Sequence, residues 1–258
     1  MKKYLWMLAA AAFPWLSHAQ GHIDGVWKTD ARSFTAPSKP SSYLLKDGQY
    51  TCFTCAPKLK VKADGADQPV PGNPYLDSMA VKVIDDAAVE MTARKGGRVL
   101  STGKVSVSAD GKTMLREMRY QEANGSSSSS TEKLTRVGPP PKEAHPISGT
   151  WKFSNYEWLS DETSTFKTAA GVLSMNGSDG MSYDAPLDGT RVPVKNSPGT
   201  DMVSVRYKGG STWEETSYRG NKVIWVNTLV VSPDGEKMKV TWDDRERGVK
   251  GTYTMSRQ

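Results

Sequence analysis

Short runs of alternating hydrophobic and polar residues predict β-strands along the whole chain. Between residues 79 and 92, Met79, Val81 and Val83 alternate with their neighbours, a turn follows near residue 86, and the chain continues with Val89. Such runs are separated by Asp-Gly, Gly-Gly, Gly-Asn or Asn-Gly pairs, which favour tight turns. No window of about eleven residues shows a helical period. The pattern therefore predicts an all-β protein.

The same pattern occurs twice in the chain. The segment Gly25-Val26-Trp27-Lys28 returns as Gly149-Thr150-Trp151-Lys152, 124 positions later, and the alignment continues without a gap as far as Met114. We predict a first repeat at residues 20–137, a proline-rich linker at 138–146 and a second repeat at 147–258. Each repeat has about 110 residues, which is enough for one modest hydrophobic core.

Both repeats predict the same hairpins. Pairing the arms around residue 86 places Lys82 opposite Glu90, and pairing around residue 210 places Arg206 opposite Glu214, so a cross-strand charge pair arises twice. The pair Gly96-Gly97 suits a two-residue turn in which both residues have a positive φ. Successive hairpins form a meander, and closing it removes the exposed strand edges. We therefore predict two tandem antiparallel up-and-down β-barrels.

The N-terminal segment has the features of a secretory signal peptide at residues 1–19. Two lysines precede an apolar run from Leu5 to Leu16, and Ser17-His18-Ala19 supplies the small residues of a cleavage site before Gln20. No later segment approaches the roughly 18 apolar residues of a transmembrane helix. We expect a protein of the periplasm or the extracellular space.

Charge argues against a nucleic-acid partner. The formal net charge is +6 and falls to about +4 without the two lysines of the signal peptide. The basic residues are scattered, whereas a nucleic-acid-binding face needs them clustered beside stacking aromatic side chains.

The two cysteines, Cys52 and Cys55, predict a disulfide, which is the default state in an oxidising compartment. A structural role and a redox role both remain open, although a thioredoxin-like pair belongs at the start of a helix in a βαβ unit. A zinc site would need further ligands, and the histidines after the signal peptide, His22 and His145, lie in flanking segments. We predict no metal site and no cofactor.

The Gly-x-Trp start followed by a β-meander resembles the lipocalin-like (calycin) barrels. In those barrels the tryptophan closes the base, so the resemblance gives this role to Trp27 and Trp151. The segments 50–55 (YTCFTC), 62–67 (KADGAD), 72–75 (GNPY), 81–86 (VKVIDD) and 107–113 (VSADGKT) look like a group of secreted bacterial tandem-repeat proteins of unassigned function. That resemblance implies the fold and assigns no catalytic residue.

Residues that differ between the repeats are the candidates for function. Arg116 shares its strand parity with Met114 and Met118, so it either enters the barrel, where it can meet an anionic ligand, or extends to the rim. Parity also directs Trp213 and Trp242 inward, where their rings either fill the barrel or line a ligand cavity.

Trp225 has the opposite parity in this pattern. We expect it to point outward and to form a contact surface, for example against the other repeat.

These features favour a secreted two-barrel protein that binds a small apolar molecule. The alternatives are a module that binds another protein or the cell envelope, and an enzyme of the isomerase or cyclase type that uses a barrel interior. We predict no catalytic residue, since the matched carboxylates Glu90 and Glu214 are interpreted as surface charge pairs. A cavity above about 300 Å³ in one barrel favours ligand binding, and two solid barrels favour the interaction module.

Overall fold

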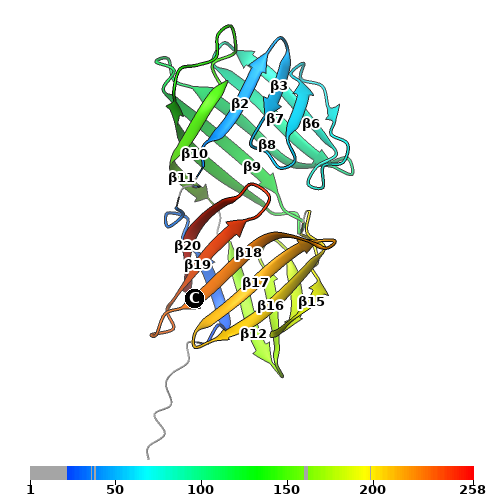
Figure 1. The fold of residues 1–258 in the computed structure, drawn as a ribbon, viewed down its shortest axis with the longest axis vertical. Helices are drawn as coiled ribbons and strands as arrows, with labels where there is room; N and C mark the ends of the chain where they lie inside the picture. Colours follow the sequence, from blue (N-terminus) through cyan, green and yellow to red (C-terminus); the bar gives the residue numbers. More distant parts are fainter. Residues whose placement is uncertain (1–21, 36, 38, 160–161, 198) are drawn as a thin grey trace, which may run out of the picture.

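The computed structural model describes residues 22–35, 37, 39–159, 162–197 and 199–258, so the predicted signal peptide lies outside the described residues. In this part of the chain the regular structure is entirely β, and the strands form two ten-stranded antiparallel sheets. Each sheet curls into a nearly closed barrel, and the barrels are stacked along the long axis of the molecule (Figure 1). The predicted fold class, two tandem antiparallel β-barrels, is confirmed.

The first barrel is formed by residues 41–159. Its strands are β2 (Ser41–Lys46), β3 (Gln49–Cys52), β4 (Leu59–Lys62), β5 (Gln68–Pro69), β6 (Ser78–Asp85), β7 (Ala88–Lys95), β8 (Arg98–Val107), β9 (Thr113–Gln121), β10 (Ser127–Val137) and β11 (Gly149–Leu159). Their order in the sheet is β4-β3-β2-β11-β10-β9-β8-β7-β6-β5. The backbone N–H of Gly65 donates to the carbonyl of Val81 (2.8 Å) and links the region after β4 to β6.

The second barrel takes one strand from the beginning of the chain and the others from its C-terminal part. Its strands are β1 (Gly25–Thr29), β12 (Thr163–Ala169), β13 (Val172–Gly177), β14 (Ser182–Pro186), β15 (Asp188–Pro193), β16 (Met202–Gly209), β17 (Thr212–Arg219), β18 (Lys222–Val231), β19 (Lys237–Asp244) and β20 (Val249–Arg257). Their order is β14-β13-β12-β1-β20-β19-β18-β17-β16-β15.

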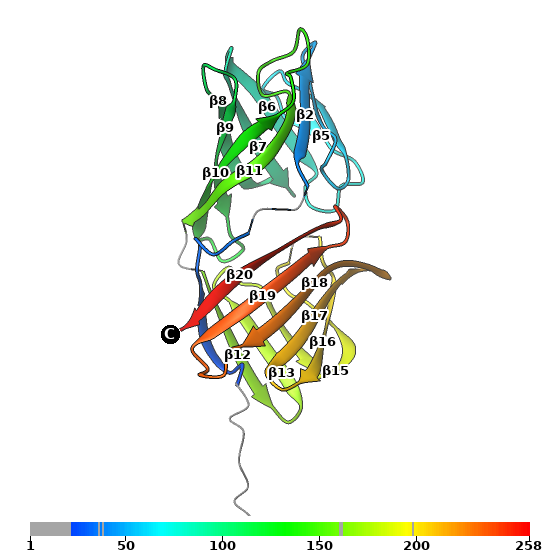
Figure 2. The same ribbon diagram turned by 60° about the vertical axis from the view of Figure 1, so that its left-hand side comes forward.

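The first strand of each repeat therefore lies in the barrel of the other repeat. Strand β1 pairs with β12 and β20, and β11 pairs with β2 and β10; Figure 2 shows β12 and β20 together in the lower barrel. The predicted boundaries at 137 and 147 describe the duplication, but the segment 138–146 connects β10 to β11 within the first barrel. The chain passes from one barrel to the other after β1, which ends at Thr29, and after β11, which ends at Leu159. Because both first strands carry the Gly-x-Trp pattern, the local sequence does not select between them.

The predicted register is confirmed in both repeats. Lys82 lies opposite Glu90 in the β6–β7 hairpin, and Arg206 lies opposite Glu214 in the β16–β17 hairpin. The ion pair of Glu214 is formed with Lys208 instead (3.7 Å). Lys208 lies at the irregularity of the β16–β17 pairing between Tyr207 and Gly209, and its side chain reaches Glu214 from there.

A fully buried tryptophan lies in the core of each barrel. Trp27 and Trp151 have 0% exposure and belong to the cores of the second and the first barrel, respectively. Each indole Nε1–H donates to the carbonyl four residues earlier, at 2.7 Å for Trp27 and 2.9 Å for Trp151. A guanidinium group covers each ring, with Arg257 over Trp27 at 4.3 Å and Arg136 over Trp151 at 4.0 Å. These contacts satisfy the polar indole N–H inside an apolar core.

None of the described residues forms a helix with the length and apolar character that a membrane crossing requires.

Candidate functional site

The first barrel encloses a cavity of about 720 Å³. Its volume exceeds the roughly 300 Å³ at which ligand pockets begin. Much of the wall is apolar and comes from strands around the whole barrel. The apolar lining includes Leu59, Met79, Met91, Val105, Met114, Met118, Ile147 and Phe153.

Small side chains keep this cavity open. Ser101 on β8 lines it, whereas the residue 124 positions later on β18 is Trp225. Gly103 lies opposite Met118, and a Cβ atom at Gly103 would lie only 2.2 Å from the sulfur of Met118. The absence of a side chain at Gly103 therefore gives Met118 room within the wall.

The second barrel holds large aromatic side chains in its interior. Trp213 and Trp242, which the sequence directs inward, are 5% and 8% exposed, and Trp213 belongs to the core of this barrel. The ring of Trp242 stacks on that of Trp225, with centroids 5.4 Å apart and planes inclined by 17°. These rings fill space that remains open in the first barrel.

The strand parity of Trp225 predicted an outward side chain, but the structure places this side chain inward. The pairing of β17 with β18 shifts between Ser217 and Tyr218, and this irregularity places Trp225 opposite Ser217 instead of Thr216. A shift of one residue moves a side chain to the other face of the sheet. Trp225 consequently stacks on Trp242, and its Nε1–H donates to Oδ1 of Asn227 (2.7 Å).

The end of the second barrel carries a smaller pocket of about 320 Å³. Trp225 lines this pocket together with Met181 and Asn227, and Ala56 and Tyr75 of the first barrel complete it. The cavity of the first barrel is in turn bordered by residues 246, 247 and 249 of the second barrel. The two barrels therefore face each other with their open ends.

A charge pair lies inside the cavity of the first barrel. Arg116 on β9 and Glu132 on β10 are directly opposite each other, and Nη1 of Arg116 is 3.2 Å from Oε2 of Glu132. The same nitrogen donates a hydrogen bond to the hydroxyl of Tyr43 (3.2 Å). The Glu132 side chain is only 9% exposed, and that of Arg116 is 25% exposed. Of the two possibilities for Arg116, the structure shows the interior position.

Tyrosines surround this charge pair. The ring of Tyr43 stacks on that of Tyr50 at 6.2 Å, and both line the cavity with Tyr120. Burial raises the pKa of Tyr50 well above its usual range, and the nearby Tyr43 adds to this effect. The hydroxyl of Tyr120 lies 3.4 Å from that of Ser130. Tyr50 is thus a neutral hydrogen-bonding group at physiological pH.

The predicted disulfide between Cys52 and Cys55 is present and lies at the cavity. The short loop that it closes carries Phe53, which is 44% exposed, and Thr54, and both residues line the cavity. The amide N–H of Cys55 also donates to the sulfur of Cys52 (3.0 Å). The disulfide therefore restrains part of the cavity wall.

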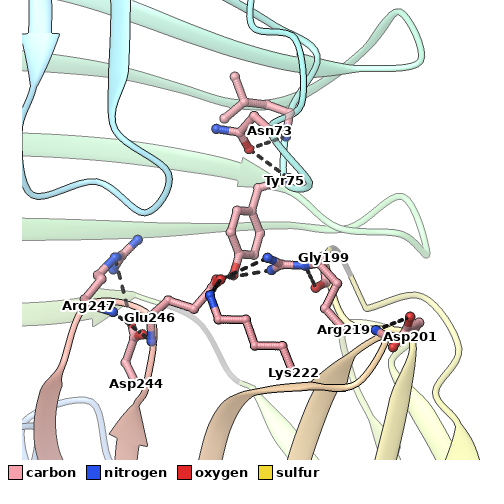
Figure 3. A network of polar contacts seen from close by, with 11 residues as sticks. Asn73, Tyr75, Gly199, Asp201, Arg219, Lys222, Asp244, Glu246 and Arg247 are labelled. Carbon is pink, nitrogen blue, oxygen red and sulfur yellow. Dashed lines mark hydrogen bonds and ion pairs between the residues drawn. The ribbon is translucent and has the colours of Figure 1, made fainter.

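A network of hydrogen bonds and ion pairs joins the two barrels next to the cavity (Figure 3). The hydroxyl of Tyr75, in the loop before β6, donates to Oε2 of Glu246, in the β19–β20 turn (2.5 Å). Arg219 binds both oxygens of Glu246 at 3.0 and 3.2 Å, and Lys222 binds one at 3.0 Å. Burial alone raises the pKa of Glu246, but the bonds from Tyr75, Lys222 and Arg219 outweigh it and lower the pKa to about 2.

The second barrel contains a half-buried carboxylate of its own, Glu215. Tyr183 donates a hydrogen bond to Oε1 and Asn227 donates one to Oε2 (3.3 Å). Burial raises the pKa of Glu215, and the two hydrogen bonds act in the opposite direction. Its oxygens are satisfied by neighbouring side chains, so this carboxylate is part of the packed interior.

Sequence reasoning found Arg116 but missed Glu132, Tyr43 and Tyr50. Glu132 alternates with the buried Leu134 along β10, and this parity places it inside. The serine-rich run before it obscured the hairpin register, and the pairing of Arg116 with Glu132 depends on that register.

Groups of three or more histidine, cysteine or carboxylate side chains placed to hold a metal ion do not occur among the described residues. Comparisons with protein-family models, curated proteins and solved structures found no match to this chain.

Proposed function

We propose that this protein binds a small, mostly apolar molecule inside the first barrel. The observation that carries the proposal is the cavity of about 720 Å³, which combines apolar side chains with polar and charged ones. Preformed cavities of this size and lining are typical of small-molecule sites. Methionine side chains suit such a site because they adapt to ligands of irregular shape.

In this proposal the second barrel serves as a partner that covers the site. Its interior holds the large side chains Trp213, Trp225 and Trp242, whereas its β19–β20 turn contributes Glu246 and Arg247 to the border of the cavity. We infer that the two copies have diverged into a binding barrel and a covering barrel.

We further propose that the protein acts in the periplasm or outside the cell as a lipocalin-like binding protein. The N-terminal sequence pattern and the disulfide between Cys52 and Cys55 support this location. The alternative function is an interaction module. Its candidate contact residue, Trp225, stacks on Trp242 and lines a pocket that Ala56 and Tyr75 of the first barrel complete, so this side chain takes part in a contact within the molecule.

The experiment that tests ligand binding is native mass spectrometry of the protein purified from cells that make it naturally. We expect a bound mass that dissociates under mild activation. In the variant Ser101→Trp, which copies Trp225 of the second barrel, the new ring occupies the cavity, and we expect affinity to fall by about tenfold or more.

The matched control is Thr102→Trp. This residue is the next one on β8 and is exposed, so its side chain leaves the cavity unchanged. Equal ligand occupancy in the two variants would show that the molecule binds elsewhere.

A further inference from the structure

The charge balance within the cavity bears on the kind of ligand it accepts. Arg116 and Glu132 face each other across adjacent strands at 3.2 Å, so their charges compensate. A ligand that brought a carboxylate or an ammonium group to this pair would leave one buried charge without a partner. An uncompensated charge is costly in a site shielded from water. An anionic group is therefore disfavoured at this pair, whereas Lys39, Lys58 and Arg247 lie elsewhere on the cavity lining.

The hydrogen-bonding capacity of the pair is not exhausted. Oε2 of Glu132 is buried and has no hydrogen-bond partner within the described residues, although it forms the ion pair with Arg116. A buried acceptor without a donor lowers stability, and most such groups find one. The contacts of Arg116 with Glu132 and Tyr43 both use Nη1, and a guanidinium group carries five N–H donors in all. The pair thus offers an acceptor together with donors.

We propose that the ligand carries one uncharged group that both donates and accepts a hydrogen bond, such as an alcohol or a primary amide. This inference rests on the proposed function, because it assumes that the cavity holds a ligand. The ligand hydroxyl or amide donates to the carboxylate of Glu132, whose side chain is 9% exposed, and accepts from the guanidinium of Arg116, whose side chain is 25% exposed. The apolar body lies against Met91, Met118 and Phe153.

Four ligands with one shared ring system test the proposal on the full chain after signal-peptide removal. They are naphthalene, naphthylmethanol, naphthoate and naphthylmethylammonium, and their dissociation constants are measured by competition with the neutral dye N-phenyl-naphthylamine. We expect the alcohol to bind about tenfold more tightly than the hydrocarbon, since it gains hydrogen bonds to charged groups. We expect both ions to bind more weakly than the alcohol.

Each outcome is informative. The ligand class is wrong if either ion binds as tightly as the alcohol, or if the alcohol gains nothing over naphthalene. If neither naphthalene nor the dye binds, the proposed function itself fails, so the two failures are distinguishable.

Substitutions that remove one charge should reverse the preference. In Glu132→Gln the guanidinium of Arg116 loses its counter-charge, and naphthoate should become the tightest ligand. In Arg116→Gln the carboxylate remains alone, and naphthylmethylammonium should become the tightest. The wild-type series and either variant suffice if the other variant does not fold. A purely structural ion pair would weaken all four ligands without changing their order, and that result would overturn the proposal.

Glu117→Gln is the matched control. Glu117 adjoins Arg116 on β9 but is exposed on the opposite face. The order of the four ligands should be the same as in the wild type, and a changed order would show that bulk charge, not the buried pair, sets the preference.

Discussion

The Glu246 carboxylate should make the association of the two barrels sensitive to acid. It receives hydrogen bonds from Tyr75 of the first barrel and from Arg219 and Lys222 of the second, and its side chain is 8% exposed. These bonds need the ionised form to be strong. The substitution Glu246→Gln removes the negative charge of this carboxylate and leaves Arg219 and Lys222 without a counter-charge.

The size of the effect follows from the pKa of Glu246, which is about 2 in place of the ordinary 4.5. A tenfold change in proton affinity corresponds to about 1.4 kcal/mol, so the lowered pKa sets a ceiling of about 3 kcal/mol. Solvent reduces this value, because the Lys222 side chain is 63% exposed. We expect about 1–2 kcal/mol near neutral pH.

The sign of the pH dependence of stability follows from the difference in the pKa of Glu246 between the folded and the unfolded protein. A carboxyl group whose pKa is lowered by folding stabilises the protein fully above its unfolded pKa of about 4.5, and it loses that contribution as the pH falls towards about 2. Urea unfolding of the wild type and of Glu246→Gln, followed by tryptophan fluorescence, measures the difference in unfolding free energy at each pH. The difference should be largest near pH 7 and should vanish at low pH.

Two further variants separate this effect from general charge. Tyr75→Phe keeps the ring beneath Arg219, 4.8 Å from the guanidinium, but removes the hydroxyl, so it should raise the pKa of Glu246 and cost less than Glu246→Gln. Glu236→Gln removes an exposed carboxylate in the turn before β19 and should have little effect. A difference for Glu246→Gln that is equally large at low and neutral pH would refute the reasoning.

The remaining predictions concern the cavity wall and the exchanged strands. The double substitution Cys52→Ser with Cys55→Ser should lower the free energy of unfolding by about 2 kcal/mol while the far-ultraviolet circular dichroism stays native, because the disulfide closes only a short loop; loss of the β-signal would contradict this. The segment 39–159 contains all ten strands of the first barrel, so it should unfold cooperatively as a separate chain. A segment that shows no cooperative transition would indicate that this barrel depends on the second one.

The hairpins of this protein could be predicted because their determinants are local. The pairing of Lys82 with Glu90 follows from a strand period of two and from a turn at residue 86. The turn at Gly96-Gly97 follows from the ease with which glycine adopts a positive φ, and the structure has values of 57° and 75° there. The same arguments hold in the second repeat for Arg206 and Glu214.

The candidate site could be predicted only in part. The parity of Arg116 indicated that it can enter the barrel, but the sequence did not show that Glu132 would neutralise it. The predicted position of Trp225 was wrong for a related reason. One irregularity in the β17–β18 pairing places its side chain on the other face of the sheet. Both results depend on the register between strands, and a slip of one residue exchanges the two faces of a strand.

The sequence by itself determined the duplication, the β-strands and the registers of the β6–β7 and β16–β17 hairpins. The strands and these two registers depend on residues close together in the chain. Only the tertiary structure decided which barrel receives each Gly-x-Trp strand, and it placed β1 in the second barrel and β11 in the first. The two strands present equivalent side chains to equivalent places, so their local sequences fit either barrel. The choice is made by pairing between distant segments, and the same long-range packing leaves one barrel hollow and fills the other.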